Sequence, residues 1–113
     1  MNNTESVKEI EKQIQRAKEL VESGKALERL RSNRDFKKIV VENYLEQECI
    51  RLVLAKADPN LQSEAKQASI LKQIDAIGAL SQYFHAVYAS AAVAEKSLEA
   101  DEQERELLIA EGV

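Results

Sequence analysis

The fold is decided by the stretch from Phe36 to Ala57, FKKIVVENYLEQECIRLVLAKA, and by the corner Asp58-Pro59-Asn60 that follows it. The apolar residues of this stretch cover well over half of a helix circumference, which is typical of a helix packed on several sides. Proline lacks the amide hydrogen and disfavours a helical conformation at the residue before it. The sequence therefore predicts a buried helix over residues 36–57 that stops at the corner.

A second helix is expected directly after the corner. Ser63 can cap it, and apolar residues then recur at three-four spacing from Ala65 to Ala91. Because so short a connection joins antiparallel helices, we expect a hairpin of residues 36–57 and 63–90. Its expected core consists of Phe36, Val40, Leu45, Ile50, Val53, Leu71, Ile74, Ile77, Leu80 and Phe84.

Before the hairpin, the chain predicts an amphipathic helix that begins near Thr4 or Ser6. Its apolar residues follow the narrow three-four spacing of a coiled-coil seam, namely Val7, Ile10, Ile14, Ala17, Leu20 and Val21. Gly24 is a candidate helix end or joint, and Asn33 or Asp35 can cap the helix that follows. Gly78, inside the hairpin, is expected to permit the close approach of a large neighbour such as Tyr44.

The last part of the chain changes character twice. Residues 86–94 are mostly small, residues 99–106 are charged, and an apolar group follows at Leu107, Leu108 and Ile109. We therefore predict an all-α fold in which the hairpin carries an amphipathic N-terminal helix and an extended C-terminal helix. The expected division is an N-terminal segment 1–31, a hairpin core 32–98 and a charged C-terminal segment 99–113.

Composition supports the helical prediction and limits the function. Of 113 residues, 44% are hydrophobic and 32% are charged, with three Gly and one Pro, and the strong helix formers are abundant. The net charge of −4 argues against general nucleic-acid binding, which requires clustered Lys and Arg. Charge is uneven, because residues 1–57 carry 12 basic and 10 acidic residues and residues 58–113 carry 4 and 10.

The best candidate for a charged binding surface is the segment 25–38. Its basic residues are Lys25, Arg29, Arg31, Arg34, Lys37 and Lys38. This segment suits an acidic protein surface, including the C-terminal segment of a neighbouring copy, or a nucleic acid. A solvated turn is the third interpretation.

No residue pattern indicates catalysis. His85 is the only histidine and Cys49 the only cysteine, so neither a zinc ligand set nor an intramolecular disulfide is available. The three glycines lie too far apart to form a phosphate-binding loop. We expect no enzyme activity, no cofactor and no metal. Without a signal peptide or a membrane-spanning stretch, the expected location is the cytoplasm.

A pattern along residues 28–95 resembles small helical virion-associated proteins of tailed bacteriophages. It consists of the basic start Asn33-Arg34-Asp35-Phe36, the arm beginning Tyr44-Leu45, the corner Asp58-Pro59 and the arm Ile77-Gly78-Ala79-Leu80. The resemblance implies a structural or assembly component of a capsid, neck or tail, assembled in the host cytoplasm. It carries over no catalytic residues and does not cover the first 27 residues.

The apolar residues that one hairpin cannot cover predict protein partners, either further copies of the chain or other virion proteins. The candidate interaction residues are Val7, Ile10, Ile14, Leu20, Val21, Arg29, Arg31, Arg34, Lys37, Lys38, Ala86, Leu107, Leu108 and Ile109. The alternative function is an intracellular helical adaptor or chaperone, or a small nucleic-acid-associated module that uses residues 25–38. Neither hypothesis involves a membrane.

Overall fold

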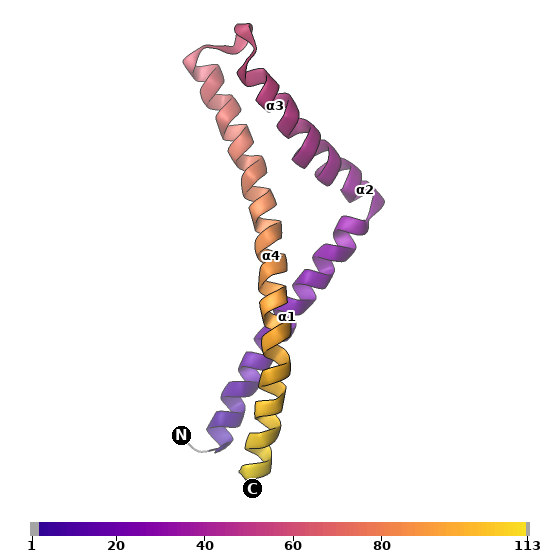
Figure 1. Ribbon diagram of the computed structural model, residues 1–113, viewed down its shortest axis with the longest axis vertical. Helices are drawn as coiled ribbons and strands as arrows, with labels where there is room; N and C mark the ends of the chain where they lie inside the picture. Colours follow the sequence, from indigo (N-terminus) through magenta and orange to yellow (C-terminus); the bar gives the residue numbers. More distant parts are fainter. Residues whose placement is uncertain (1–2, 113) are drawn as a thin grey trace. The chain divides into compact units, whose positions relative to one another are not determined.

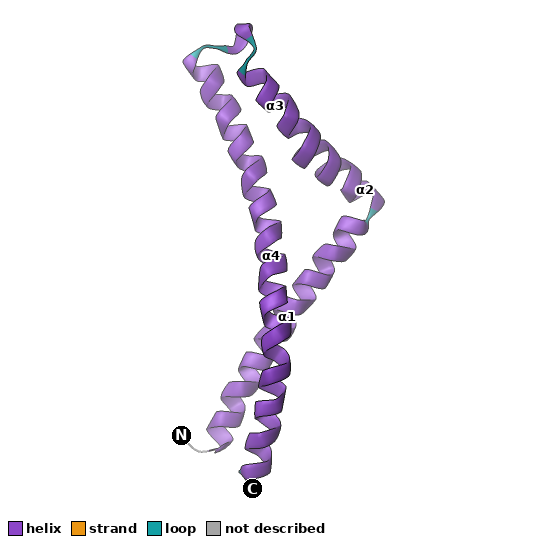
Figure 2. Ribbon diagram, viewed as in Figure 1, coloured by secondary structure: helices purple, strands orange, loops and turns teal. Residues whose placement is uncertain are grey.

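The computed structural model describes residues 3–112, and every regular element among them is a helix (Figure 2). In chain order these are α1 (Asn3–Ser32), α2 (Arg34–Phe36), the π-helix η1 (Lys37–Glu48), α3 (Cys49–Lys56), the 3-10 helix η2 (Pro59–Leu61) and α4 (Glu64–Glu111) (Figure 1). The all-helical fold expected from the composition is thus confirmed.

The helices form two compact units, and α1 and α4 contribute to both. Residues 28–85 make up the central unit, and residues 1–27 together with residues 86–113 make up the terminal unit. Each unit has its own buried residues. The terminal unit combines segments from the two ends of the sequence, so its packing depends on contacts between residues far apart in the chain.

The core of the central unit lies where α3 packs on the first part of α4. Leu52 of α3 is only 1% exposed and clusters with Ile70 and Ile77 of α4. The half-buried side chains around this cluster are Tyr44, Leu45, Cys49, Ala55, Leu61 and Ile74. Burial of the Leu52 side chain alone stabilises the fold by roughly 1.5–3 kcal/mol, because it removes apolar surface from water.

Local polar contacts fix the corner between α3 and α4. The Asp58 side chain accepts from the backbone N–H of Asn60 at 2.9 Å, with Pro59 at the start of η2. The side-chain amide of Gln67 donates to the carbonyl of Leu61 at 2.8 Å. Ser63 Oγ accepts from the backbone N–H of Lys66 at 3.2 Å, which is the N-cap expected from the sequence.

The other end of the central unit is organised around Phe84. Asn33 caps α2, because its side-chain oxygen accepts from the backbone N–H groups of Asp35 at 3.1 Å and Phe36 at 3.0 Å. The ring of Phe36 then lies 6.2 Å from the ring of Phe84 in a tilted arrangement. The guanidinium of Arg31 lies 5.9 Å from the same ring centroid, within cation–π range.

Two expectations about the hairpin are corrected. Residues Lys37–Glu48 form a π-helix, a rare form that usually occurs as single turns. The side chains of Ile50, Val53 and Leu71 were expected in the core but are 54%, 53% and 46% exposed. A helix that is apolar on most sides needs several neighbours, and within this unit α3 packs on α4 along one face only.

In the terminal unit the first part of α1 and the last part of α4 run antiparallel, side by side (Figure 1). The side-chain amide of Asn3 donates to the carbonyl of Leu108 at 3.3 Å. Ile10, Ile14 and Ala17 are buried, with 4%, 3% and 5% of their surface exposed. α4 of the same chain therefore covers most of the predicted seam of α1, and Leu20 stays 44% exposed.

The predictions for the two glycines within the helices are both wrong. α1 continues past Gly24, which is buried, and a Cβ atom added there would lie 2.5 Å from the Cβ of Ala91. Gly24 therefore permits the close approach of α1 and α4. A Cβ atom added at Gly78 would have no neighbour within 4 Å, so no large side chain packs on that glycine.

Candidate interaction surfaces

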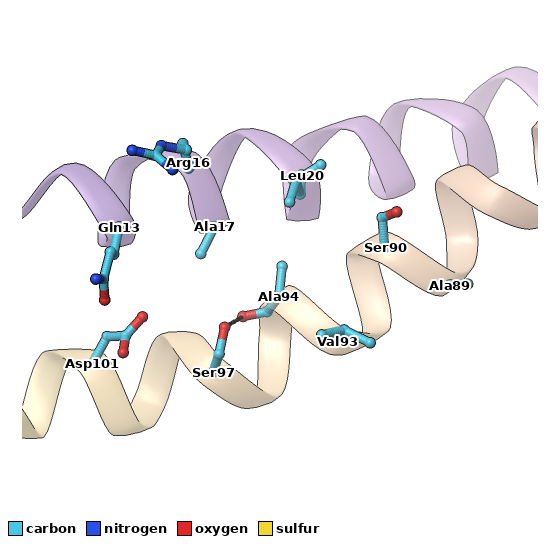
Figure 3. Close-up of a pocket in the computed structure, with 10 residues that line it drawn as sticks. All are labelled: Gln13, Arg16, Ala17, Leu20, Ala89, Ser90, Val93, Ala94, Ser97 and Asp101. Atoms are coloured by element: carbon cyan, nitrogen blue, oxygen red, sulfur yellow. Dashed lines mark hydrogen bonds between the residues drawn. The ribbon is translucent and has the colours of Figure 1, made fainter. Parts of the chain in front are cut away.

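An open groove with a volume of about 620 Å³ runs along one side of the terminal unit, between α1 and α4 (Figure 3). α1 contributes Gln13, Arg16, Ala17 and Leu20, and α4 contributes Ala89, Ser90, Val93, Ala94, Ser97 and Asp101. Most of these side chains are small or apolar. The mostly small and apolar lining suits another helix rather than a polar small molecule.

The floor and the edges of the groove differ in exposure. Ala17 and Ala94 point toward each other on the floor and are 5% and 3% exposed (Figure 3). Leu20 and Val93, along the edges, are 44% and 69% exposed. The Ser97 hydroxyl donates to the carbonyl of Ala94 at 3.1 Å, so its polar hydrogen is satisfied without solvent.

A smaller hollow of about 310 Å³ lies near the ends of the same two helices. It is lined by Asn3, Thr4, Val7, Lys8, Leu108, Ile109 and Gly112. Ile109, in this lining, is 50% exposed, and Leu107, outside it, is 62% exposed. The terminal apolar group predicted from the sequence is therefore divided, with Leu108 half-buried and its neighbours toward solvent.

The structure separates the predicted apolar interaction residues into two groups. Ile10 and Ile14 are buried, and Val7, Val21 and Leu108 are half-buried within the terminal unit. Leu20, Ala86, Leu107 and Ile109 are exposed. Contacts with another protein are therefore open to the second group, whereas the first group holds the chain's own helices together.

Sequence reasoning missed a further exposed apolar face in the central unit. Ile39, Ile50, Val53 and Leu54 are 59%, 54%, 53% and 68% exposed. The sequence pattern predicted that residues of this face lie in the core. A wide apolar stripe has the same sequence pattern whether its outer side packs on the same chain or on a partner protein. Their spacing of three and four residues, from Ile50 to Val53 and Leu54, was the available signal.

The basic segment 25–38 does not form one uniform charged face. Within the central unit, the side chains of Arg29, Arg34, Lys37 and Lys38 are exposed. Arg31 is half-buried and directed at the ring of Phe84, so it stabilises the junction of α1 with α4 in this unit. The exposed residues Arg34, Lys37 and Lys38, where α2 leads into η1, are a part of the segment open to an acidic partner.

Cys49 and His85, the two residues considered for chemistry, differ in their surroundings. Cys49 is half-buried against the Leu52 cluster, and His85 is exposed on α4. No group of three His, Cys, Asp or Glu side chains that could hold a metal occurs within residues 3–112. Over the same residues, no helix combines the length and the apolar character needed to span a membrane.

One ion pair is geometrically well formed. The Arg51 Nε donates to both carboxylate oxygens of Glu48, at 3.1 and 3.0 Å, and Arg51 Nη2 contacts the same carboxylate. The hydrogen bonds from Arg51, together with its charge, lower the pKa of Glu48, and the carboxylate raises the pKa of Arg51 in turn. Arg51 is exposed and Glu48 is half-buried at the surface, where such pairs contribute little to stability.

Comparison of the chain with protein families, with curated proteins and with solved structures gave no match in any of the three. The exposed apolar faces and the groove of the terminal unit are therefore the basis for assigning a function.

Proposed function

We propose that this chain is a non-enzymatic structural or assembly component of a tailed-phage virion, and that it acts through packing of its helices on other copies or other virion proteins. The observation that carries the proposal is the exposure of large apolar side chains on long helices. Val93, Leu54 and Leu107 are 69%, 68% and 62% exposed. Side chains of this kind gather where proteins contact one another.

The resemblance of residues 28–95 to small virion-associated helical proteins supports the phage assignment. Their shared pattern includes the corner Asp58-Pro59, which joins α3 to α4 in the structure. A particle component needs surfaces that bind other proteins and no chemistry of its own. The chain offers such surfaces in both units.

The experiment is a composition analysis of particles. If the gene for this chain lies in a phage or prophage genome, quantitative mass spectrometry of purified particles should find the chain at a fixed ratio to the major capsid protein. Deletion of the gene should stop assembly or leave an incomplete particle. Particles that lack the chain and assemble normally would contradict the proposal.

A second candidate function is an intracellular adaptor or chaperone, or a nucleic-acid-associated module, based on residues 25–38. The exposure of Arg34, Lys37 and Lys38 favours it. Binding to nucleic acid weakens steeply as salt rises, because phosphate contacts release counterions. Binding through an apolar helical interface changes little with salt. A salt titration of any complex separates the two functions.

A further inference from the structure

The open side of α4 in the terminal unit carries a second row of residues, distinct from the face that packs on α1. The row consists of Ala86, Ser90, Val93, Ser97, Ala100 and Leu107, at three-four spacing or its multiples. All six are exposed, and Ser90, Val93 and Ser97 also line the groove. A row with this spacing is a seam for another helix.

We propose that a second copy of this chain covers the row, with the two α4 helices antiparallel and a two-fold axis beside Val93. Each α4 then lies in the groove between α1 and α4 of the other copy. The inference deepens the proposed function and rests on it, since it names the partner for the surface of the terminal unit.

The spacing of the row is the first argument for a second copy. Ala86 and Ala100 each lie seven residues from Val93. An antiparallel pair that is two-fold symmetric about Val93 therefore sets Ala86 of each copy against Ala100 of the other, and Val93 against Val93. Two-fold interfaces require this self-complementarity. Small residues on both sides let the helix axes approach closely.

Charge gives the second argument and fixes the direction. Glu104 continues the row between Ala100 and Leu107, so a parallel, in-register pair would set it beside Glu104 of the other copy, and like charges across an interface are unfavourable. The antiparallel pair instead sets Glu104 level with Gln82 of the other copy. The residues 76–94 include no Asp, Glu, Lys or Arg, so the acidic side chains of one copy meet no like charge there.

The contacts within one chain leave the groove able to accept α4 of a second copy. Leu20 of α1, 44% exposed, forms the far edge, where it would contact α4 of the other copy. Ser97 can be enclosed without an unsatisfied donor, because its hydroxyl already bonds the Ala94 carbonyl at 3.1 Å. The floor, formed by Ala17 and Ala94, is already dry.

Cysteine cross-linking of the full-length chain tests the geometry. Cys49 is the only cysteine, so a C49A background allows single cysteines to be placed on α4. The geometry predicts that C49A/V93C forms a disulfide-linked dimer under mild oxidation, whereas C49A/A86C alone does not. A mixture of C49A/A86C with C49A/A100C should cross-link. C49A/A92C, exposed on another face of α4, is the matched control and should not.

Solution mass provides the independent readout. V93D should weaken dimerisation by about 100-fold or more, because two carboxylates would be forced together without partners. Helix content should stay the same, since Val93 is 69% exposed within one chain. Cross-linking of C49A/A86C as fast as C49A/V93C would show a parallel pair and overturn the inference, as would a V93D protein of unchanged mass.

Failure of this inference is distinguishable from failure of the proposed function. Particles that contain the chain, together with no cross-link at position 93, would retain the proposed function and reject the second copy as occupant. A cross-linked dimer that is absent from particles would retain the second copy as occupant and reject the proposed function.

Discussion

The terminal and central units bury the apolar faces of their helices to different degrees. In the terminal unit, α1 has a narrow apolar seam, and one helix covers it so well that Ile10 and Ile14 are 4% and 3% exposed. In the central unit, α3 is apolar on most sides, and its contact with α4 leaves Ile50 and Val53 more than half exposed. A single neighbouring helix therefore buries most of a narrow apolar seam but leaves part of a wide apolar stripe exposed.

The largest effect is expected from charges placed in the seam of the terminal unit. Replacing both Ile10 and Ile14 with Asp buries two carboxylates without partners and should remove more than about 5 kcal/mol, which unfolds this unit. Hydrogen exchange should show lost protection in residues 3–27 and 86–112, with the Leu52 cluster still protected. Unchanged helix content with a smaller solution mass would show instead that the seam binds another copy.

The next effect tests the core of the central unit. Leu52→Ala should lower the free energy of unfolding by about 2–5 kcal/mol, because Leu52 is 1% exposed and its truncation leaves a cavity. Leu54→Ala is the matched control on the same helix, 68% exposed, and should change it by less than about 0.5 kcal/mol. Equal losses in urea denaturation would mean that α3 packs by its other face.

Replacing the two glycines within the long helices by alanine should change the stability in opposite directions. Gly24→Ala should destabilise by about 1–3 kcal/mol, because the new Cβ would lie 2.5 Å from the Cβ of Ala91 and force the helices apart. Gly78→Ala meets no atom within 4 Å and should stabilise by about 0.5–1 kcal/mol through helix propensity. Thermal melts of both variants provide the check. Stabilisation by Gly24→Ala would disprove the close approach.

The smallest effect concerns the exposed ion pair of Glu48 and Arg51. Because Arg51 lowers the pKa of Glu48 in the folded chain, the pair stabilises the fold above the ordinary glutamate pKa and loses this effect as pH falls through the lowered value. Glu48→Gln should leave the urea midpoint at neutral pH nearly unchanged. A large change would mean that η1 depends on this pair.

Local signals in the sequence were sufficient for the helix boundaries at Asp58 and Ser63, because each side chain bonds its own neighbouring backbone. For the cap of α2 they left Asn33 and Asp35 as alternatives, and the structure has Asn33. They were also sufficient for the seam at Ile10 and Ile14, because a regular apolar spacing predicts burial directly. These features depend on residues close together in the chain.

Features that depend on distant residues were not predictable in the same way. The seam of α1 indicates that another helix covers it, but the charged segment 99–106 did not indicate that the last part of α4 is that helix. The role of Gly24 depends on Ala91, and the exposure of Ile50 depends on how many helices surround α3. No local pattern distinguishes a face covered by the same chain from a face left for a partner.

The solution mass of the unaltered chain tests most directly the claim that its exposed apolar faces serve assembly. Sedimentation equilibrium over a wide concentration range should give a mass that rises to a multiple of the 12.7 kDa chain, and this rise should persist at high salt because the faces are apolar. A mass of 12.7 kDa at every concentration up to the solubility limit would contradict the account.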